Sequence, residues 1–185
     1  MAAALKPGKP QGFGRRKSLG AALVLSAAPS TSQVQAAVEA IYKQLLNRTP
    51  LNAERLGDAE SQLRDGQLSV ADFVAQLALS DLFLQRLNRM APLRAAAAAY
   101  LALLGRAAQP QETSRFLATR VSRGLPQAIA DILNSAEYSR SFGQDTVPYI
   151  KGLNTSDGIP LSTVNRTANL YEGNAGLTPK PREAI

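Results

Sequence analysis

Between residues 33 and 142 the apolar side chains recur at helical spacing in short segments, most of which end at a glycine or a proline. An amphipathic helix repeats its apolar positions every three or four residues, whereas a half-buried strand alternates every second residue. Val34, Val38, Ile41 and Leu45 show the helical spacing clearly. The chain also lacks tryptophan and is rich in alanine and leucine, which favours packed helices over a sandwich or a barrel.

The ends of these segments define the expected helices. The first should begin after Ser32, whose hydroxyl caps it while Gln35 completes a capping box. The others are expected over about 53–65, after the cap Ser69, from Asp81, over 92–104, from Pro110, from Pro126 and after the cap Ser135. In the helix that starts at Pro110, we expect Phe116, Leu117 and Val121 to face the core. The predicted fold is all-α, a compact bundle of about seven to eight short helices with extended N- and C-terminal arms.

Charge and composition divide the chain into three parts. Residues 1–32 carry five basic and no acidic side chains, whereas residues 33–150 carry 12 basic and 11 acidic ones. Beyond Gly143 the chain has four prolines and four glycines among polar residues and shows no helical period. We therefore expect a basic N-terminal arm over 1–32, a helical domain over 33–150 and an extended C-terminal arm over 151–185. A basic arm favours an acidic partner, which could be nucleic acid, an anionic membrane surface or an acidic protein.

The residue types that are missing restrict the chemistry. Histidine and cysteine are both absent, which excludes imidazole and thiolate nucleophiles, zinc sites built on these residues, and disulfides. Paired carboxylates such as Asp58 with Glu60, or Asp65 with Asp72, remain, but they lie among polar helical positions and we expect them to be exposed. No apolar run approaches the roughly 20 residues that span a bilayer. The sequence therefore predicts a protein that is not an enzyme.

An internal repeat runs through the helical part. The segment 41–48 recurs as 99–106, 58 residues later, and the segment 73–83 recurs as 128–138, 55 residues later. In each unit one helix ends with Leu-Leu-x-Arg, and a later helix ends with a serine, an acidic residue and an aromatic residue. Two copies are too few for a solenoid, so we expect one helical domain with pseudo-twofold internal similarity.

Several motifs resemble the linker domain of phycobilisome linker polypeptides. They are the Tyr-Lys-Gln-Leu-Leu helix within 37–48, Glu-Ser-Gln-Leu-Arg-Asp-Gly at 60–66, Ser-x-x-Phe at 80–83, Asn-Ser-x-Glu-Tyr at 134–138 and Asp-Thr-Val-Pro-Tyr at 145–149. The similarity covers residues 33–153 with the motifs in the right order. The Leu-Gly-Arg and Ser-Ala-Glu-Tyr pieces are shared with a bacterial repeat domain of secreted and surface-layer proteins.

The resemblance implies a colourless structural linker. Such a protein sits in the cavity of phycobiliprotein discs, joins them within the phycobilisome, the light-harvesting antenna of photosynthesis in cyanobacteria and red algae, and tunes energy transfer. Its partners would be alpha/beta hexamers of phycocyanin, allophycocyanin or phycoerythrin, and other linkers, with no nucleic acid. It would lie at the cytoplasmic or stromal face of the thylakoid membrane, which it meets only through the complex. Because the chain has no cysteine, it binds no bilin through a thioether, and nearby bilins would belong to partner subunits.

The residues expected to contact a partner lie in both arms and on one part of the helical domain. They are Phe13, Arg15, Arg16, Lys17, Arg86, Arg89, Arg94, Tyr149, Arg166 and Tyr171. Arg86, Arg89 and Arg94 have two other interpretations. They could form a solvated face whose aliphatic stems cover apolar surface, or they could contact nucleic acid. Packing within the domain does not explain the run at 145–149. Tyr149, Arg166 and Tyr171 either lie on a solvated tail without a role or anchor the C-terminal part to a partner.

Two alternative functions remain open at this point. Arg15, Arg16 and Lys17 precede a short apolar run that imitates an export signal, which favours a surface-layer or secreted helical repeat module. The basic composition also fits a nucleic-acid-binding protein, although the helical part is nearly neutral. Within the linker interpretation, the sequence leaves the rod, rod-core and core classes open.

Overall fold

The computed structural model describes residues 22–26 and 29–151. In these residues the chain forms α1 (Thr31–Leu46), the 3-10 turn η1 (Asn52–Glu54), α2 (Gly57–Arg64), α3 (Val70–Ala78), α4 (Asp81–Asn88), α5 (Pro92–Leu104), α6 (Pro110–Arg123), α7 (Leu125–Leu133) and α8 (Ala136–Phe142). The only strand-like pairing in this part is an isolated antiparallel bridge between Val24 and Thr146. The all-α prediction is confirmed.

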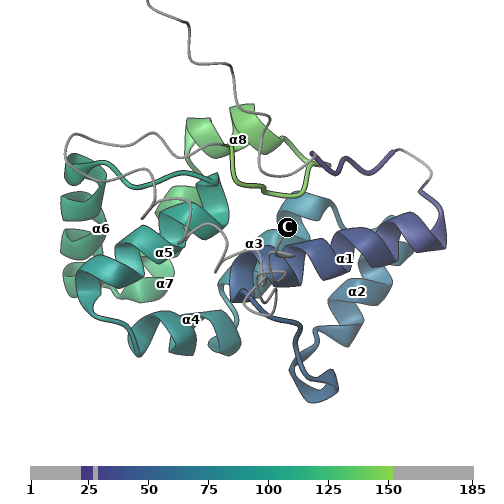
Figure 1. The fold of residues 1–185 in the computed structure, drawn as a ribbon, viewed down its shortest axis with the longest axis horizontal. Helices are drawn as coiled ribbons and strands as arrows, with labels where there is room; N and C mark the ends of the chain where they lie inside the picture. Colours follow the sequence, from purple (N-terminus) through teal and green to yellow (C-terminus); the bar gives the residue numbers. More distant parts are fainter. Residues whose placement is uncertain (1–21, 27–28, 152–185) are drawn as a thin grey trace, which may run out of the picture.

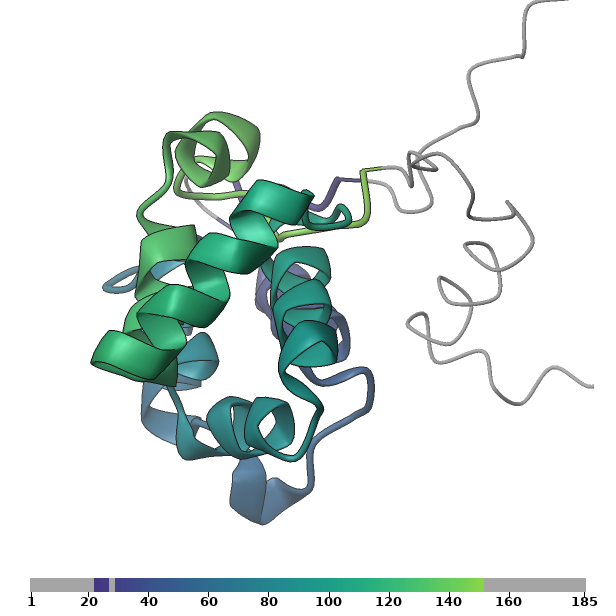
Figure 2. The same cartoon turned by 90° about the vertical axis from the view of Figure 1, so that its left-hand side faces the viewer.

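The helices form two halves, α1–α4 and α5–α8, which meet where α5 contacts α1 and α4 and where α3 contacts α7. In the orientation of Figure 1, α1 and α2 lie at one end and α5, α6 and α7 at the other, with α8 above and α4 below; Figure 2 shows the same arrangement from the side. Helix α5 contacts α1, α4, α6, α7 and α8. Five of its alanines are buried, Ala95, Ala96, Ala98, Ala99 and Ala102. Their small side chains allow the other helices to approach this central helix closely.

A single apolar core fills the space between the helices. Its largest fully buried side chains include Tyr42, Phe73 and Phe83 of the first half and Leu103 and Ile129 of the second. The rings of Tyr42 and Phe73 meet edge to face, with centroids 5.9 Å apart. Phe73 and Tyr100 are both buried in this core.

The first helix begins two residues earlier than predicted. The hydroxyl of Ser30 accepts a hydrogen bond from the Gln33 amide at 3.3 Å, and the Gln33 side chain accepts one from the Ser30 amide at 2.9 Å. The expected cap at Ser32 is therefore wrong. The prediction failed because the capping-box pattern Ser-x-x-Gln occurs twice, at 30–33 and at 32–35.

The helix expected over 53–65 is interrupted. Residues 52–54 form the turn η1, Arg55 takes an extended conformation, and α2 starts only at Gly57. The interruption lets the Leu56 amide donate to the phenol oxygen of Tyr42 at 2.7 Å. The corresponding stretch of the second half continues without a break as α6.

Val121 is 89% exposed, so the prediction that it faces the core is wrong. Phe116 of the same helix is buried. Because an α-helix has 3.6 residues per turn, a residue five positions later lies about 140° around the helix. Val121 therefore cannot share the buried face of Phe116.

The two ends of the described chain pack onto the domain. The Leu25 amide donates to the carbonyl of Asp145 at 3.0 Å, and the Val147 amide donates to the carbonyl of Leu23 at 2.9 Å. Leu25, Val147 and Ile150 are all buried. Residues 145–149 are therefore held by packing, contrary to the expectation from the sequence.

Candidate partner-binding face

Six of the ten predicted contact residues, Phe13, Arg15, Arg16, Lys17, Arg166 and Tyr171, lie outside the residues that the structure describes. The other four occupy two separate places. Arg86, Arg89 and Arg94 lie on α4, at its C-terminal end and in the first turn of α5. Tyr149 lies in the segment that follows α8.

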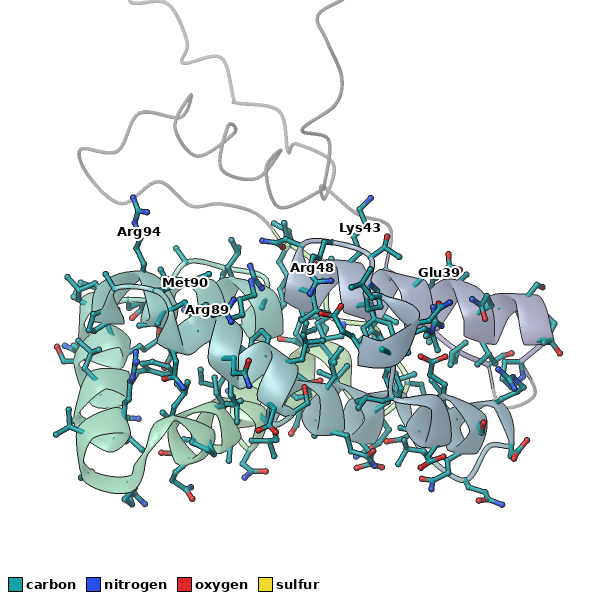
Figure 3. All side chains as sticks on the ribbon, turned by 90° about the horizontal axis from the view of Figure 1, so that it is seen from below. Glu39, Lys43, Arg48, Arg89, Met90 and Arg94 are labelled. Atoms are coloured by element: carbon teal, nitrogen blue, oxygen red, sulfur yellow. The ribbon has the colours of Figure 1, made fainter. Side chains whose placement is uncertain are left out.

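The arginines of α4 and α5 lie on the same side of the molecule as Lys43 of α1 and Arg48, which follows α1. We call these five residues, Lys43, Arg48, Arg86, Arg89 and Arg94, the basic face. Figure 3 shows Arg94, Arg89, Arg48 and Lys43 along one side of the molecule, with Met90 and Glu39 beside them. Helix α1 and the consecutive helices α4 and α5, which are distant from it in sequence, therefore bring their cations to one side.

The five cations differ in their exposure and in the hydrogen bonds and ion pairs that they form within the described chain. Arg86 is half-buried and donates from Nη1 to the carbonyl of Leu45 near the end of α1. Lys43, Arg89 and Arg94 are exposed, and within the described part of the chain their side chains have no hydrogen bond or ion pair. The latter three are available to an external anion, whereas Arg86 also supports the fold.

A hollow of about 330 Å³ opens in the basic face. Its apolar part is made by Leu46, Leu82 and Met90, and its polar part by Arg48, Glu54, Gln85, Arg86 and Arg89. Three cations and one carboxylate give this hollow an excess of positive charge. It can therefore accept an apolar group that carries an anion.

Arg48 and Glu54 hold the loop at the edge of the hollow. The two guanidinium Nη atoms donate to the two carboxylate oxygens at 2.7 and 2.8 Å, and the Leu51 amide donates to the same carboxylate at 2.9 Å. The hydrogen bond from Arg48 lowers the pKa of Glu54 to about 2. Both groups are therefore charged at neutral pH.

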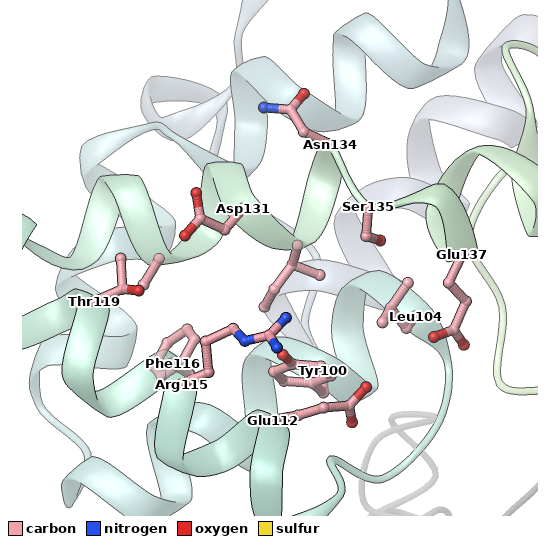
Figure 4. Close-up of a pocket in the computed structure, with 12 residues that line it drawn as sticks. Tyr100, Leu104, Glu112, Arg115, Phe116, Thr119, Asp131, Asn134, Ser135 and Glu137 are labelled. Carbon is pink, nitrogen blue, oxygen red and sulfur yellow. The ribbon is translucent and has the colours of Figure 1, made fainter.

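The second half has the corresponding ion pair with an additional member. Arg106 donates to Glu112 at 2.6 and 2.8 Å, and its Nε donates to Glu137 of α8 at 2.7 Å. The hydrogen bonds to Arg106 lower the pKa of both glutamates and raise the pKa of the guanidinium. A second hollow has a volume of about 310 Å³ and is lined by the apolar or aromatic side chains of Tyr100, Leu104 and Phe116 and by the charged side chains of Glu112, Arg115 and Glu137. Figure 4 shows these residues, with Arg115 reaching toward Tyr100.

Tyr149 is half-buried. Its ring lies edge to face with Phe142 at a centroid distance of 5.8 Å, and its backbone lies against Gly105. One side of this tyrosine is therefore part of the domain, and only its remaining surface is available to a partner.

The carboxylates of the described residues include one that is buried against expectation, and they form no cluster that could hold a metal ion. Glu60, expected to be exposed, is buried and bound by Tyr42 and Arg55. Within residues 22–26 and 29–151, no three acidic side chains are placed to hold a metal ion. No helix in the same residues is long and apolar enough to cross a membrane.

Comparison with known proteins identifies the family. The sequence profile of the phycobilisome linker polypeptides matches residues 29–151, which is the whole helical part. The chain belongs to this family. The resemblance inferred from the motifs is thereby confirmed.

Relatives among the phycobilisome linkers cover most of this chain. It is 36% identical over 166 residues to the phycoerythrin-associated 27.9 kDa rod linker of Microchaete diplosiphon, an alignment that covers 87% of this chain and 67% of the relative. It is 34% identical to the phycocyanin-associated 37.5 kDa rod linker of that organism, over 79% of this chain and 55% of the relative. It is 32% identical to the phycobiliprotein ApcE there, over 92% of this chain and 16% of the relative. The chain thus spans about half of the phycocyanin-associated linker.

Sequence reasoning missed Lys43 and Arg48 of the basic face, and it missed Leu82 and Met90 of the hollow in that face. One signal was present, because Arg48 closes the Leu-Leu-x-Arg motif that recurs at Arg106. The other three lie on α1, on α4 and directly after α4, and their proximity follows only from how these elements pack.

Proposed function

We propose that this chain is a non-enzymatic structural linker that seats in the cavity of phycobiliprotein discs, joins them within the phycobilisome and tunes their energy transfer. The observation that carries the proposal is the basic face of a phycobilisome linker domain, with Lys43, Arg89 and Arg94 exposed and unpaired within the described residues. An acidic disc surface gains complementary electrostatics and a defined orientation from such a face.

The relatives support a choice of partner. Two of them are named as associated with phycoerythrin and with phycocyanin, both in rods. A rod position and hexamers of one of these phycobiliproteins are therefore the assignment that we propose. Within the phycobilisome the chain would lie at the cytoplasmic or stromal face of the thylakoid membrane.

The arms complete the proposed interface. Phe13, Arg15, Arg16 and Lys17 would contact acidic surfaces from the N-terminal side, and Arg166 and Tyr171 from the C-terminal side. The free surface of Tyr149 would meet the same partner, since tyrosine and arginine carry much of the energy of protein interfaces.

The test is binding of the full chain to purified phycocyanin and phycoerythrin hexamers, followed by co-elution and by the absorption band of the discs. We expect tight binding to at least one of them and a shifted band. The double change of Arg89 and Arg94 to alanine should weaken binding and reduce its dependence on ionic strength. Arg64→Ala on α2, also exposed and unpaired in the described chain, is the matched control and should bind normally. Failure of the unaltered chain to bind any disc would overturn the proposal.

A further inference from the structure

The two halves of the domain hold equivalent arginines in the same way. Arg48 and Arg106 each follow a residue in the left-handed conformation, Asn47 (φ 56°) and Gly105 (φ 66°), at the end of a helix. Each uses its two Nη atoms to bind the glutamate six residues later in the sequence. The internal repeat therefore extends to the detail of this bidentate pair.

The halves differ in what binds the Nε edge of the two arginines. Nε and Nη2 of Arg106 bind a second carboxylate, that of Glu137 on α8. The repeat aligns Glu137 with Leu82 on α4. Within the described residues the Nε of Arg48 accordingly has no hydrogen bond, and its side chain is 48% exposed against 22% for Arg106.

The hollow in the basic face lies beside Arg48. Arg48 and Leu82 both line this hollow, and Arg89, exposed and unpaired within the described part, lines it as well. The position of Glu137 in the second half therefore corresponds to the apolar Leu82 in the first half, in a hollow that Arg48, Arg86 and Arg89 also line. A guanidinium that binds carboxylates on two edges is already realised at Arg106, so the geometry is accessible to this fold.

We infer that the hollow binds an aspartate or glutamate side chain of a phycobiliprotein subunit, which takes the role that Glu137 has in the second half. The carboxylate pairs with the Nε edge of Arg48 and with Arg89. The apolar stem of the incoming residue packs on Leu82 and Met90. This inference rests on the proposed function, because the occupant is a residue of the disc.

The test places the missing carboxylate on the chain itself. In Leu82→Glu the new side chain should pair with Arg48 as Glu137 pairs with Arg106, and should repel the partner's carboxylate. We expect the affinity of the full chain for phycocyanin or phycoerythrin hexamers to fall by about tenfold or more. Leu82→Gln has nearly the same shape without the charge and should bind much closer to the unaltered chain. Gln111→Glu, at an exposed position on α6, adds the same charge elsewhere and should leave binding unchanged.

A double-mutant cycle makes the assignment specific to Arg48. Arg48→Gln alone should weaken binding, and adding Leu82→Glu to it should cost much less than Leu82→Glu costs in the unaltered chain. Far-ultraviolet circular dichroism and the melting temperature verify that each variant is folded. Normal binding by folded Leu82→Glu would overturn the inference, as would full additivity of the two changes. Absence of disc binding by the unaltered chain would instead show that the proposed function is wrong.

Discussion

The phenol of Tyr42 donates a hydrogen bond to the carboxylate of Glu60 at 2.9 Å, 18 residues further along the chain. Both residues are buried, and Arg55 neutralises the carboxylate from 2.7 Å while its guanidinium lies over the tyrosine ring at 5.5 Å. Burial is the main cause that raises the pKa of Tyr42 to about 12, so the phenol stays protonated and remains a donor. The connection between α1 and α2 is therefore fixed by a satisfied polar cluster inside the core.

Removing this hydroxyl should destabilise the domain. Tyr42→Phe leaves the Leu56 amide without its acceptor and the Glu60 carboxylate with one donor fewer, and we expect a loss of about 1–3 kcal/mol in the free energy of unfolding. Tyr138→Phe is the matched control, because the Tyr138 hydroxyl is buried without a hydrogen-bond partner in the described structure. That change should be neutral or stabilising. Equal losses for the two variants in urea unfolding would contradict the account of the Tyr42 cluster.

A second prediction concerns the contact between Gly105 and Tyr149. The Lys151 amide donates to the Gly105 carbonyl at 2.9 Å, and a Cβ on Gly105 would overlap the Tyr149 carbonyl oxygen. Gly66 also has a positive φ, but a Cβ there meets nothing within 4 Å. Gly66→Ala should therefore cost only the backbone strain of about 1–2 kcal/mol. Gly105→Ala should cost about 1–3 kcal/mol more, because the segment after α8 must also shift.

The melting temperatures of the two glycine variants measure the difference in their stability. Limited proteolysis shows where in the chain that difference arises. Cleavage after α8 should become faster in Gly105→Ala and stay unchanged in Gly66→Ala. If the two variants have the same melting temperature, the segment at 149–151 contributes little to the stability of the domain.

A third prediction tests the apolar core. Phe73 is fully buried against the Tyr42 ring, so Phe73→Ala should reduce the free energy of unfolding by about 3–5 kcal/mol. Val121→Ala, at the exposed position on α6, should change it by less than about 0.5 kcal/mol. Denaturant unfolding of both variants provides the comparison. A small effect of Phe73→Ala would be inconsistent with a fully buried Phe73 ring.

A fourth prediction follows from the lowered carboxyl pKa values. The pKa of Glu54 is about 2, and hydrogen bonds from Arg106 lower the pKa of Glu112 and Glu137. A carboxyl whose pKa is lower in the folded than in the unfolded chain stabilises the fold fully above its unfolded value of about 4.3. That stabilisation is lost as the pH falls through the folded value. The melting temperature should therefore decrease between about pH 5 and pH 2.

The double change of Glu112 and Glu137 to glutamine isolates the Arg106 cluster. This variant should melt lower than the unaltered chain at pH 7 and lose less on acidification, because the two carboxyls no longer titrate. Calorimetry over the acid range distinguishes the outcomes. Parallel pH profiles for the two proteins would show that the cluster does not contribute to acid sensitivity.

The sequence predicted the helices well where their boundaries are local. The hydroxyl of Ser69 caps α3, Pro92 starts α5 and Gly105 ends it, as expected, because these residues act on the backbone next to them. The break at Arg55 was missed since its cause, the Tyr42 hydroxyl, comes from another helix.

The candidate site was less accessible to sequence reasoning. The repeat aligned Arg48 with Arg106 and Leu82 with Glu137, but the meaning of that difference depends on α8 lying beside Arg106 and α4 beside Arg48. The contact of Arg86 with the Leu45 carbonyl and the burial of Glu60 arise in the same way, from packing between segments far apart in the chain. Such relationships have no signature in local spacing.

The proposed function requires this chain to join phycobiliprotein discs. Analytical ultracentrifugation of purified hexamers with increasing amounts of the full chain tests this joining. Single discs should convert to a faster particle of two or more stacked discs that contains the chain at a fixed ratio. Discs that remain single at every ratio, whether or not they carry the chain, would contradict the proposed function.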